Sequence, residues 1–275
     1  MSNSPDTKRI LLTGATDGIG LETARSLVSL GHQVLLHGRN PDKLNAAARE
    51  LSSKSGISEI ETYVADLSHM TEVESLAKAV ADKHPHLDAL INNAGVYITP
   101  EPITSDGLDA RFAVNTIAPW LLTQQLLPLL EETGRVVNLS SAAQSAVNLD
   151  ALAGNVRLSD GEAYAQSKLA LTMWSRYLAE QLGASGPAII AVNPGSFLGS
   201  KMVKEAFGSS GKDLKIGADI LTRATLDDEF ASASGKYFDN DSGRFASPHP
   251  DALDADKTTA VVRAIKSVLA KLSNS

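Results

Sequence analysis

Short apolar runs alternate along the chain with longer segments whose apolar residues recur at helical spacing. Strands that alternate with helices of ten or more residues indicate βαβ units and a parallel sheet, so this alternation restricts the fold more than any other feature. The predicted strands are residues 9–12, 33–36, 62–65, 89–92, 135–139, 188–193 and 236–238. The predicted helices are residues 19–30, 41–51, 105–130, 163–182, 214–224 and 254–272, with one more opened by a capping box at Thr71 and Glu74.

The predicted fold class is α/β, with a doubly wound parallel sheet and helices on both faces. Right-handed crossovers distribute successive helices over the two faces, and the strands are mostly apolar, as expected for a sheet that is covered on both sides. A length of 275 residues fits one large domain better than two small ones. Ligands in such folds bind beyond the carboxyl ends of the strands, which is where the polar motifs of this chain fall.

The composition excludes several classes of function. The chain has no cysteine, which excludes disulfides, thiolate-bound metals and thiol nucleophiles. Its 25 basic and 32 acidic residues give a net charge of −7 with no basic run, which argues against a nucleic acid partner. Residues 1–8 are polar and no apolar run reaches the roughly 18 residues of a membrane span, so we expect a cytoplasmic protein. No metal site is expected, and six histidines are expected at the surface: His32, His37, His69, His84, His86 and His249.

A glycine-rich segment, residues 13–20 with the sequence Thr-Gly-Ala-Thr-Asp-Gly-Ile-Gly, joins the first predicted strand to the first predicted helix. Glycine permits a tight turn in which backbone N–H groups approach a diphosphate, and the helix N-terminus adds a partial positive charge. Such a segment can also be a plain turn, but its place between a strand and a helix favours nucleotide binding. The expected contacts are Gly14, Thr16, Asp17, Gly18, Ile19 and Gly20.

The Gly-x3-Gly-x-Gly spacing resembles that of the short-chain dehydrogenase/reductase family, and further motifs follow in the family's order. They are Asp66-Leu67, the Asn-Asn-Ala-Gly run at residues 92–95, Asn115, Ser140-Ser141, Tyr164-x3-Lys168 and Asn193-Pro194-Gly195. Tyr164 comes 23 positions after Ser141, a long spacing that resembles the retinol-dehydrogenase and protochlorophyllide-reductase-like branches. The resemblance implies a single Rossmann-like NAD(P)-binding domain over residues 8–275, preceded by a flexible tail of residues 1–7.

The expected catalytic chemistry centres on Tyr164 and Lys168, which share one face of a helix because they are four positions apart. A tyrosine pKa near 10 is too high for acid–base work at neutral pH, and a nearby ammonium lowers it. The family resemblance implies that Tyr164 gives a proton to the substrate carbonyl and that Ser141 hydrogen-bonds the same oxygen. It also implies that Lys168 holds ribose hydroxyls and that Asn115 supports a water that returns protons. Ser141 could instead serve a hydrolase, but no Gly-x-Ser-x-Gly elbow surrounds it.

The end of the second strand predicts which nicotinamide cofactor binds. A carboxylate there would hold the ribose hydroxyls of NAD, but the chain has Gly38 followed by Arg39, and a guanidinium suits a 2′-phosphate. NADP(H) is therefore favoured over NAD(H), although Arg39 could also stack on adenine or be solvated, and Asp17 lies where NADP-binding members often carry a basic residue. The remaining cofactor contacts implied by the resemblance are Asn40, Asp66, Leu67, Asn93, Ala94, Gly95, Tyr164, Lys168, Pro194 and Gly195.

Residues 196–217 are rich in glycine and serine around Phe197, Leu198, Met202, Val203 and Phe207. Loops of this kind often close over ligands, so we expect a substrate lid, with a plain surface connector as the alternative. The apolar residues indicate a hydrophobic carbonyl or alcohol as the small-molecule substrate. Two other functions remain open: reduction of a carbon–carbon double bond by the same Tyr and Lys, and a non-catalytic NADP-sensing regulator. Family members are commonly homodimers or homotetramers, and monomers occur in the longer-spaced branch.

Overall fold

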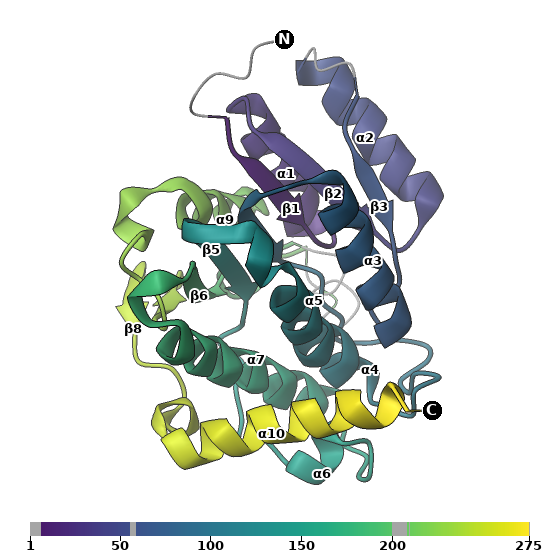
Figure 1. The fold of residues 1–275 in the computed structure, drawn as a ribbon, viewed down its shortest axis with the longest axis vertical. Coiled ribbons are helices and arrows are strands. Elements are labelled where there is room, and N and C mark those ends of the chain that lie inside the picture. The colour runs from purple at the N-terminus through teal and green to yellow at the C-terminus, as the bar shows by residue number, and fades with distance from the viewer. Residues whose placement is uncertain (1–6, 56–58, 200–207, 209, 275) are drawn as a thin grey trace.

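The computed structural model describes residues 7–55, 59–199, 208 and 210–274, so residues 1–6 of the expected tail lie outside it. Within the described residues, strands form a sheet in the order β3-β2-β1-β4-β5-β6-β7-β8 (Figure 1). Neighbouring strands are parallel except β7 and β8, which are antiparallel. The strands are β1 (Arg9–Leu12), β2 (Gln33–Gly38), β3 (Thr62–Val64), β4 (Leu87–Asn92), β5 (Leu130–Leu139), β6 (Ala188–Asn193), β7 (Tyr237–Asp239) and β8 (Arg244–Ala246).

Helices cover both faces of this sheet, which confirms the predicted single-domain, doubly wound α/β fold. One face carries α1, α2 and α9, and the other carries α3, α5 and α7, with α10 packed across α7 (Figure 1). The helices are α1 (Gly18–Ser29), α2 (Pro41–Ser55), α3 (Met70–Lys83), α4 (Ala110–Phe112), α5 (Ala118–Leu126), α6 (Leu149–Leu152), α7 (Asp160–Leu182), α9 (Lys215–Leu226) and α10 (Ala255–Leu272). Among the described helices, none is both long enough and apolar enough to cross a membrane.

The strand side chains explain why the sheet is buried on both faces. Ile10 and Leu12 of β1 belong to the core under α1 and α9, whereas Leu11 between them belongs to the core under α3 and α5. All three are fully buried. Successive side chains of a strand point to opposite faces, so a strand without polar residues needs a helical layer on each side.

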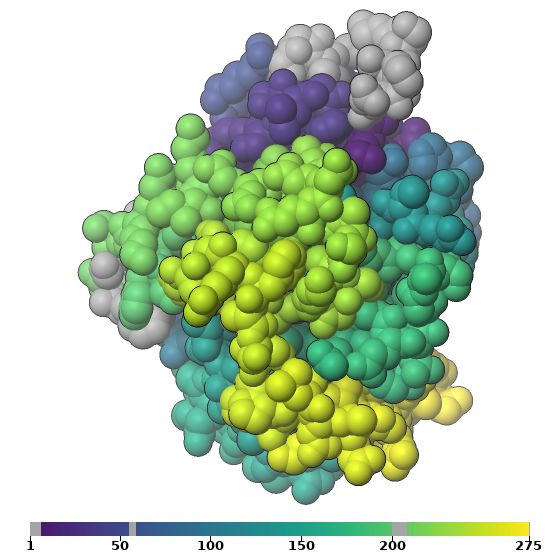
Figure 2. Space-filling view, turned by 90° about the vertical axis from the view of Figure 1, so that its left-hand side faces the viewer, coloured from purple at the N-terminus to yellow at the C-terminus, as the bar shows by residue number. Residues whose placement is uncertain are grey.

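The sequence did not predict the strand β8, which pairs antiparallel with β7 at one edge of the otherwise parallel sheet. This three-residue strand has no apolar run and is partly exposed, so its sequence carries no strand periodicity. Phe245 attaches it to the core, because its ring packs against Phe230 and Phe238. Figure 2 looks onto this side of the molecule, where the chain after residue 208, from light green to yellow, covers much of the surface.

The predicted helix over residues 105–130 is also wrong in its bounds and its regularity. The structure begins α4 at Ala110, where Asp109 accepts a hydrogen bond from the Arg111 N–H, and Ala113–Ile117 form a π-helical turn before α5. Pro119 supplies a physical reason, since it has no N–H for the carbonyl four residues earlier, which is that of Asn115. Single π-helical turns inside α-helices frequently occur at functional sites.

Two smaller predictions fail for similar reasons. The capping box at Thr71 and Glu74 does not form: the N-cap of α3 is His69, two residues before Thr71, and the N–H of the first helical residue, Met70, donates to Asp106 Oδ2 at 3.3 Å. A partner from a distant loop therefore replaces the local cap. His37 and His84 are buried rather than at the surface, because the strand β2 and the end of α3 that carry them are covered by neighbouring elements.

Candidate active site

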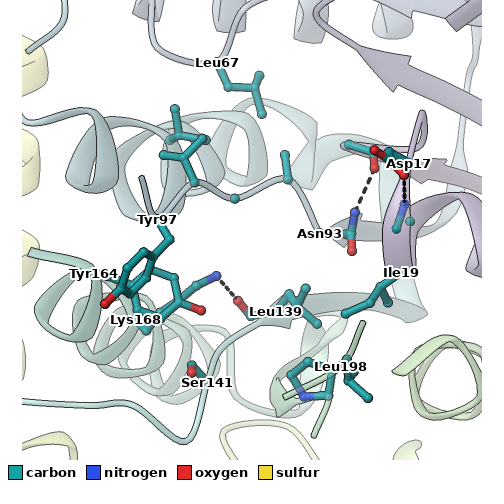
Figure 3. A pocket seen from close by; sticks show the side chains of 18 of the residues that line it. Asp17, Ile19, Leu67, Asn93, Tyr97, Leu139, Ser141, Tyr164, Lys168 and Leu198 are labelled. Carbon is teal, nitrogen blue, oxygen red and sulfur yellow. Dashed lines mark hydrogen bonds between the residues drawn. The ribbon is translucent and has the colours of Figure 1, made fainter. Parts of the chain in front are cut away.

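A cavity of about 710 Å³ opens beyond the carboxyl ends of the central strands (Figure 3). It extends from the glycine-rich segment at one end to Tyr164 at the other (Figure 3). Of the residues predicted for the site, Asn115 is the one that does not line it. The others do: Gly14, Thr16, Asp17, Gly18, Ile19, Gly20, Arg39, Asn40, Asp66, Leu67, Asn93, Ala94, Gly95, Ser141, Tyr164, Lys168, Pro194 and Gly195.

The glycine-rich segment is folded so tightly that its glycine positions cannot carry a side chain without strain or a clash. Gly14 and Gly18 adopt φ angles of +67° and +57°, which glycine tolerates far better than other residues. A Cβ on Gly20 would lie 2.1 Å from the Gly14 carbonyl oxygen. Asn93, at the end of β4, fastens the turn by donating from Nδ2 to the carbonyls of Thr13 and Gly14 at 2.8 and 3.0 Å. The loop is therefore held open for a ligand that approaches its backbone.

His37 is a second support of this loop, and sequence reasoning missed it. Its Nδ1 lies 3.3 Å from the Gly14 nitrogen and its Nε2 lies 3.0 Å from the Ala65 oxygen. Burial lowers the pKa of His37 to about 4, so at neutral pH the uncharged ring accepts from Gly14 and donates to Ala65. The only sequence signal was a histidine inside an otherwise apolar strand, which does not identify the partner.

Charged residues surround the mouth of the cavity near the end of β2. The Asp17 carboxylate caps α1 by accepting from the Gly18 N–H at 2.7 Å, and the Arg39 side chain is exposed. Burial alone would raise the pKa of Asp66, but hydrogen bonds from Ser68 and the charge of Arg39 outweigh it and hold that pKa below its ordinary value. Asn40 caps the start of α2, since its Oδ1 accepts from the Lys43 N–H at 3.0 Å.

The helix α7 places Tyr164 and Lys168 at the other end of the cavity. A capping box formed by Ser159 and Glu162 sets its start, so Tyr164 lies in its second turn and Lys168 one turn further on. The Lys168 side chain is buried, and its Nζ donates to the Leu139 carbonyl at 2.6 Å and lies 5.8 Å from the centre of the Tyr164 ring (Figure 3).

Ser141 follows β5 and lines the cavity next to Tyr164. Its carbonyl accepts from Gln144 Nε2 at 3.0 Å and from the Tyr237 hydroxyl at 3.1 Å. The backbone of the serine is thus held by a near neighbour, Gln144, and by Tyr237 from the C-terminal part of the chain. Sequence reasoning missed Gln144 and Tyr237, since neither belongs to a motif that contacts a reacting group.

The electrostatics of the pair differ from the sequence-based expectation. Burial raises the pKa of Tyr164, and a hydrogen bond with Ser141 opposes this rise only in part. Burial also lowers the pKa of Lys168 to about 7, so near neutral pH its ammonium is only partly charged. For the protein's own residues, the net shift of the Tyr164 pKa is therefore upward, opposite to the predicted direction. A protonated Tyr164 at neutral pH suits a proton donor.

We expect Lys168→Met to change the pH dependence of stability in a defined direction. Because the Lys168 pKa falls from 10.5 to about 7 on folding, the unfolded chain binds a proton in this window that the folded chain does not. Wild-type stability therefore gains up to about 1.4 kcal/mol per pH unit from this residue as the pH rises through the window, and the variant lacks that gain. Urea unfolding of both proteins at several pH values measures the difference. Parallel curves would show that Lys168 keeps an ordinary pKa.

Asn115 lies in the π-helical turn and acts between elements rather than in the cavity. Its Oδ1 accepts from the Val96 N–H at 2.8 Å, and its Nδ2 donates to the Val96 carbonyl at 2.9 Å and to Ser167 Oγ at 3.0 Å. It thereby joins the loop after β4 to α7. Its implied support of a proton-returning water stays a prediction. Among the described residues, no group of three His, Asp or Glu side chains is arranged to hold a metal.

The expected lid begins beside the cavity, which Ser196, Phe197 and Leu198 line, and its residues 200–207 and 209, with Met202, Val203 and Phe207, lie outside the described residues. Lys212 joins the two ends, since its N–H donates to the Phe197 carbonyl and its carbonyl accepts from Gly199, each at 2.7 Å. Asp241 anchors the entry by accepting from the Ser196 N–H at 2.9 Å. Sequence reasoning missed Asp241, whose only signal was a turn-forming composition.

Comparison with known proteins gives a consistent assignment. A family model described as short chain dehydrogenase matches residues 8–210. Retinol dehydrogenase 13 of Homo sapiens is 31% identical over 90% of this chain and 80% of its own length, and retinol dehydrogenase 12 of Bos taurus is 34% identical over 88% and 80%. A crystal structure of an uncharacterised protein from Mycobacterium paratuberculosis has a TM-score of 0.78, with 29% identity over 95% of this chain and 92% of that one. A short chain dehydrogenase from Escherichia coli complexed with NADPH has a TM-score of 0.67, with 29% identity over 85% and 96%.

Proposed function

The chain belongs to the short-chain dehydrogenase family, in a retinol-dehydrogenase-like branch, and is therefore an oxidoreductase; from this premise we propose that it transfers hydride between NADP(H) and the carbonyl or alcohol group of a neutral, hydrophobic small molecule. One observation carries the proposal. Tyr164, Lys168 and Ser141 meet at one end of a single cavity whose other end is the glycine-rich loop. A dinucleotide bound along this cavity would bring its reactive ring to the tyrosine.

The residues present fit a nicotinamide dinucleotide. A Cβ on Gly14 would lie 2.8 Å from the Ala94 Cα, and one on Gly20 would meet the Gly14 backbone, so the loop has the close backbone approach that a diphosphate requires. The N-terminus of α1 adds a partial positive charge at the same place. Arg39 at the β2 end supplies a guanidinium for a 2′-phosphate, and Lys168 would hold ribose hydroxyls.

The protein's own groups then perform the proton chemistry. When bound, the cofactor supplies or accepts the hydride. In the reducing direction, the Tyr164 hydroxyl donates a proton to the carbonyl oxygen, and Ser141 Oγ hydrogen-bonds the same oxygen and orients it. The raised pKa of Tyr164 keeps the phenol protonated before reaction, and the Lys168 ammonium, in its charged form, stabilises the phenolate that remains.

The lining of the cavity supports a neutral, hydrophobic substrate. Tyr97 packs against Tyr164, and Val96, Ile98, Ala142 and Ala143, which adjoin Tyr97 or Ser141 along the chain, also line the cavity. The charged lining residues Asp17, Arg39, Lys43 and Asp66 belong to the cofactor end. Lys168 is the described charged lining residue beside Tyr164, and its Nζ is already bonded to the Leu139 carbonyl. A substrate carboxylate or phosphate placed among the apolar groups would lose its hydration without a partner, which is costly. We propose residues 196–217 as the lid that excludes water from this end.

An absorbance screen of NADPH oxidation and NADP reduction, across carbonyls and alcohols of increasing size, tests the function. We expect turnover with neutral hydrophobic ketones, aldehydes or their alcohols, and weak or no turnover with carboxylated analogues. Reduction of enones only at the carbon–carbon bond would favour the double-bond reductase instead. NADPH binding without turnover of any compound would favour a nucleotide-sensing regulator. The cytoplasmic location and the oligomeric state stay predictions from the sequence.

We expect Arg39→Asp to remove the preference for NADPH over NADH. A hydrogen bond to a charged group contributes about 1.5–3 kcal/mol, so NADPH affinity should fall by about 10- to 100-fold while NADH affinity changes little. Titration of the fluorescence of bound reduced cofactor measures both constants. Arg49→Asp makes the same charge change at an exposed position of α2 outside the lining of the cavity, and should keep the preference. An unchanged NADPH constant in Arg39→Asp would contradict the 2′-phosphate role.

A further inference from the structure

We propose that Tyr97 is a specificity-determining residue, whose ring forms a fixed wall beside Tyr164 and limits the size of the group that a substrate places there. The inference rests on the proposed function, because it concerns the substrate end of the same cavity. Tyr97 lies on the loop after β4 and lines the cavity. None of the motifs found in the sequence includes it.

The two tyrosine rings are in direct contact. Their centroids are 4.8 Å apart and their planes are tilted by 59° (Figure 3), an arrangement that aromatic pairs favour. A substrate whose carbonyl oxygen reaches the Tyr164 hydroxyl must therefore place one of its substituents against or past the Tyr97 ring. The space at this position is set by a large and rigid side chain rather than by a flexible one.

The backbone under the Tyr97 ring is held on both sides. The preceding residue, Val96, is bonded through its N–H and carbonyl to the Asn115 amide at 2.8 and 2.9 Å. The Tyr97 carbonyl accepts from Arg111 Nη1 at 3.4 Å. Arg111 is itself 1% exposed and also binds Asp109 and Asp160. Moving this stretch of backbone away from the cavity would break the hydrogen bonds that Val96 makes with Asn115 and that Tyr97 makes with Arg111.

The first turn of α7 is shaped to accept this side chain. Gly161 lies under the Tyr97 hydroxyl, and a Cβ at that position would be 3.3 Å from Tyr97 Oη. Such a contact is tighter than an ordinary van der Waals contact, so a glycine at position 161 leaves room for the Tyr97 side chain. The next residue of the loop, Ile98, is 46% exposed and lies at the mouth of the cavity. The two neighbours should therefore differ in their effect on substrate size.

Steady-state kinetics of Tyr97→Ala, Tyr97→Phe and Ile98→Ala test the inference. The substrates are a set of neutral ketones in which one substituent on the carbonyl is a methyl group and then grows to an aryl or branched alkyl group. In Tyr97→Ala, the ratio of kcat/KM for bulky over small ketones should rise about tenfold or more. Tyr97→Phe should keep the wild-type ratio because it keeps the ring, and Ile98→Ala should shift it much less.

Each outcome bears on a defined statement. NADPH affinity near the wild-type value in Tyr97→Ala, with a changed substrate ratio, supports the specificity role. An equal loss of kcat/KM for every ketone would overturn it, since a merely structural role predicts a uniform loss. An active wild type with an unchanged ratio in Tyr97→Ala would leave the proposed function standing and refute the wall. A wild type that turns over no carbonyl or alcohol would refute the proposed function, and the inference with it.

Discussion

Tyr164→Phe is expected to lower kcat by about 10²- to 10⁴-fold, the range that a positioned general acid or base contributes. The substitution removes one oxygen and keeps the ring that packs against Tyr97. Without the phenol, the only remaining proton donor of the proposed pair is the Ser141 hydroxyl, which is a far weaker acid than a phenol. NADPH affinity should stay close to the wild-type value, because the glycine-rich loop and Arg39 are untouched.

Turnover of the best carbonyl substrate, followed by NADPH absorbance, measures this loss. Tyr177→Phe is the matched control, since it removes the same atom from a partly buried tyrosine of α7 that does not line the cavity. The control should keep nearly the wild-type kcat. A Tyr164→Phe enzyme with more than about a tenth of wild-type turnover would fall outside the range for a general acid and refute the assignment.

Arg111→Met is expected to lower the free energy of unfolding by about 3–5 kcal/mol, the usual cost of removing one partner of a buried ion pair. Asp109 is 4% exposed, and its carboxylate accepts hydrogen bonds from Nε and Nη2 of Arg111 at 2.8 and 2.6 Å. The substitution would leave this carboxylate buried without its counter-charge. It would also release Asp160 at the start of α7 and the Tyr97 carbonyl.

Urea unfolding of wild type and variant measures the change. Lys78→Met breaks the pair between Lys78 and Asp82, which is as short as 2.7 Å but lies on the exposed face of α3. Exposed pairs four apart on a helix contribute about 0.3–0.5 kcal/mol, so this control should lose little. A loss of less than about 1 kcal/mol in Arg111→Met would mean that Asp109 finds a replacement partner or water.

The positions of the site residues could be predicted because their signals are local. Apolar runs marked the strands, and the polar motifs fell directly after them, at Gly14, Asn93, Ser141 and Gly195. Carboxyl ends of parallel strands meet at one edge of a sheet, so motifs far apart in the sequence come together without further information. Asn115 is the exception, since its place within the helical segment does not reveal that its amide faces Val96.

The contacts that support the site could not be predicted. His37 of β2 hydrogen-bonds the Gly14 N–H, and the Tyr237 hydroxyl hydrogen-bonds the Ser141 carbonyl, which lies 96 positions earlier in the chain. Arg111 joins Tyr97 to Asp160, which are likewise distant in sequence. Each of these residues has an unremarkable neighbourhood in the chain, because what defines its role is the partner and not the adjacent residues.

The amino-acid sequence by itself determined the doubly wound sheet, the family and the order in which the site residues follow the strands, since strand and helix periodicity and turn chemistry depend on neighbours along the chain. Only the tertiary structure decided the charge states of Tyr164 and Lys168, the π-helical turn and the wall formed by Tyr97. Desolvation and ring packing depend on atoms contributed by residues far away in the chain, and these come together only when the sheet and its helices are assembled.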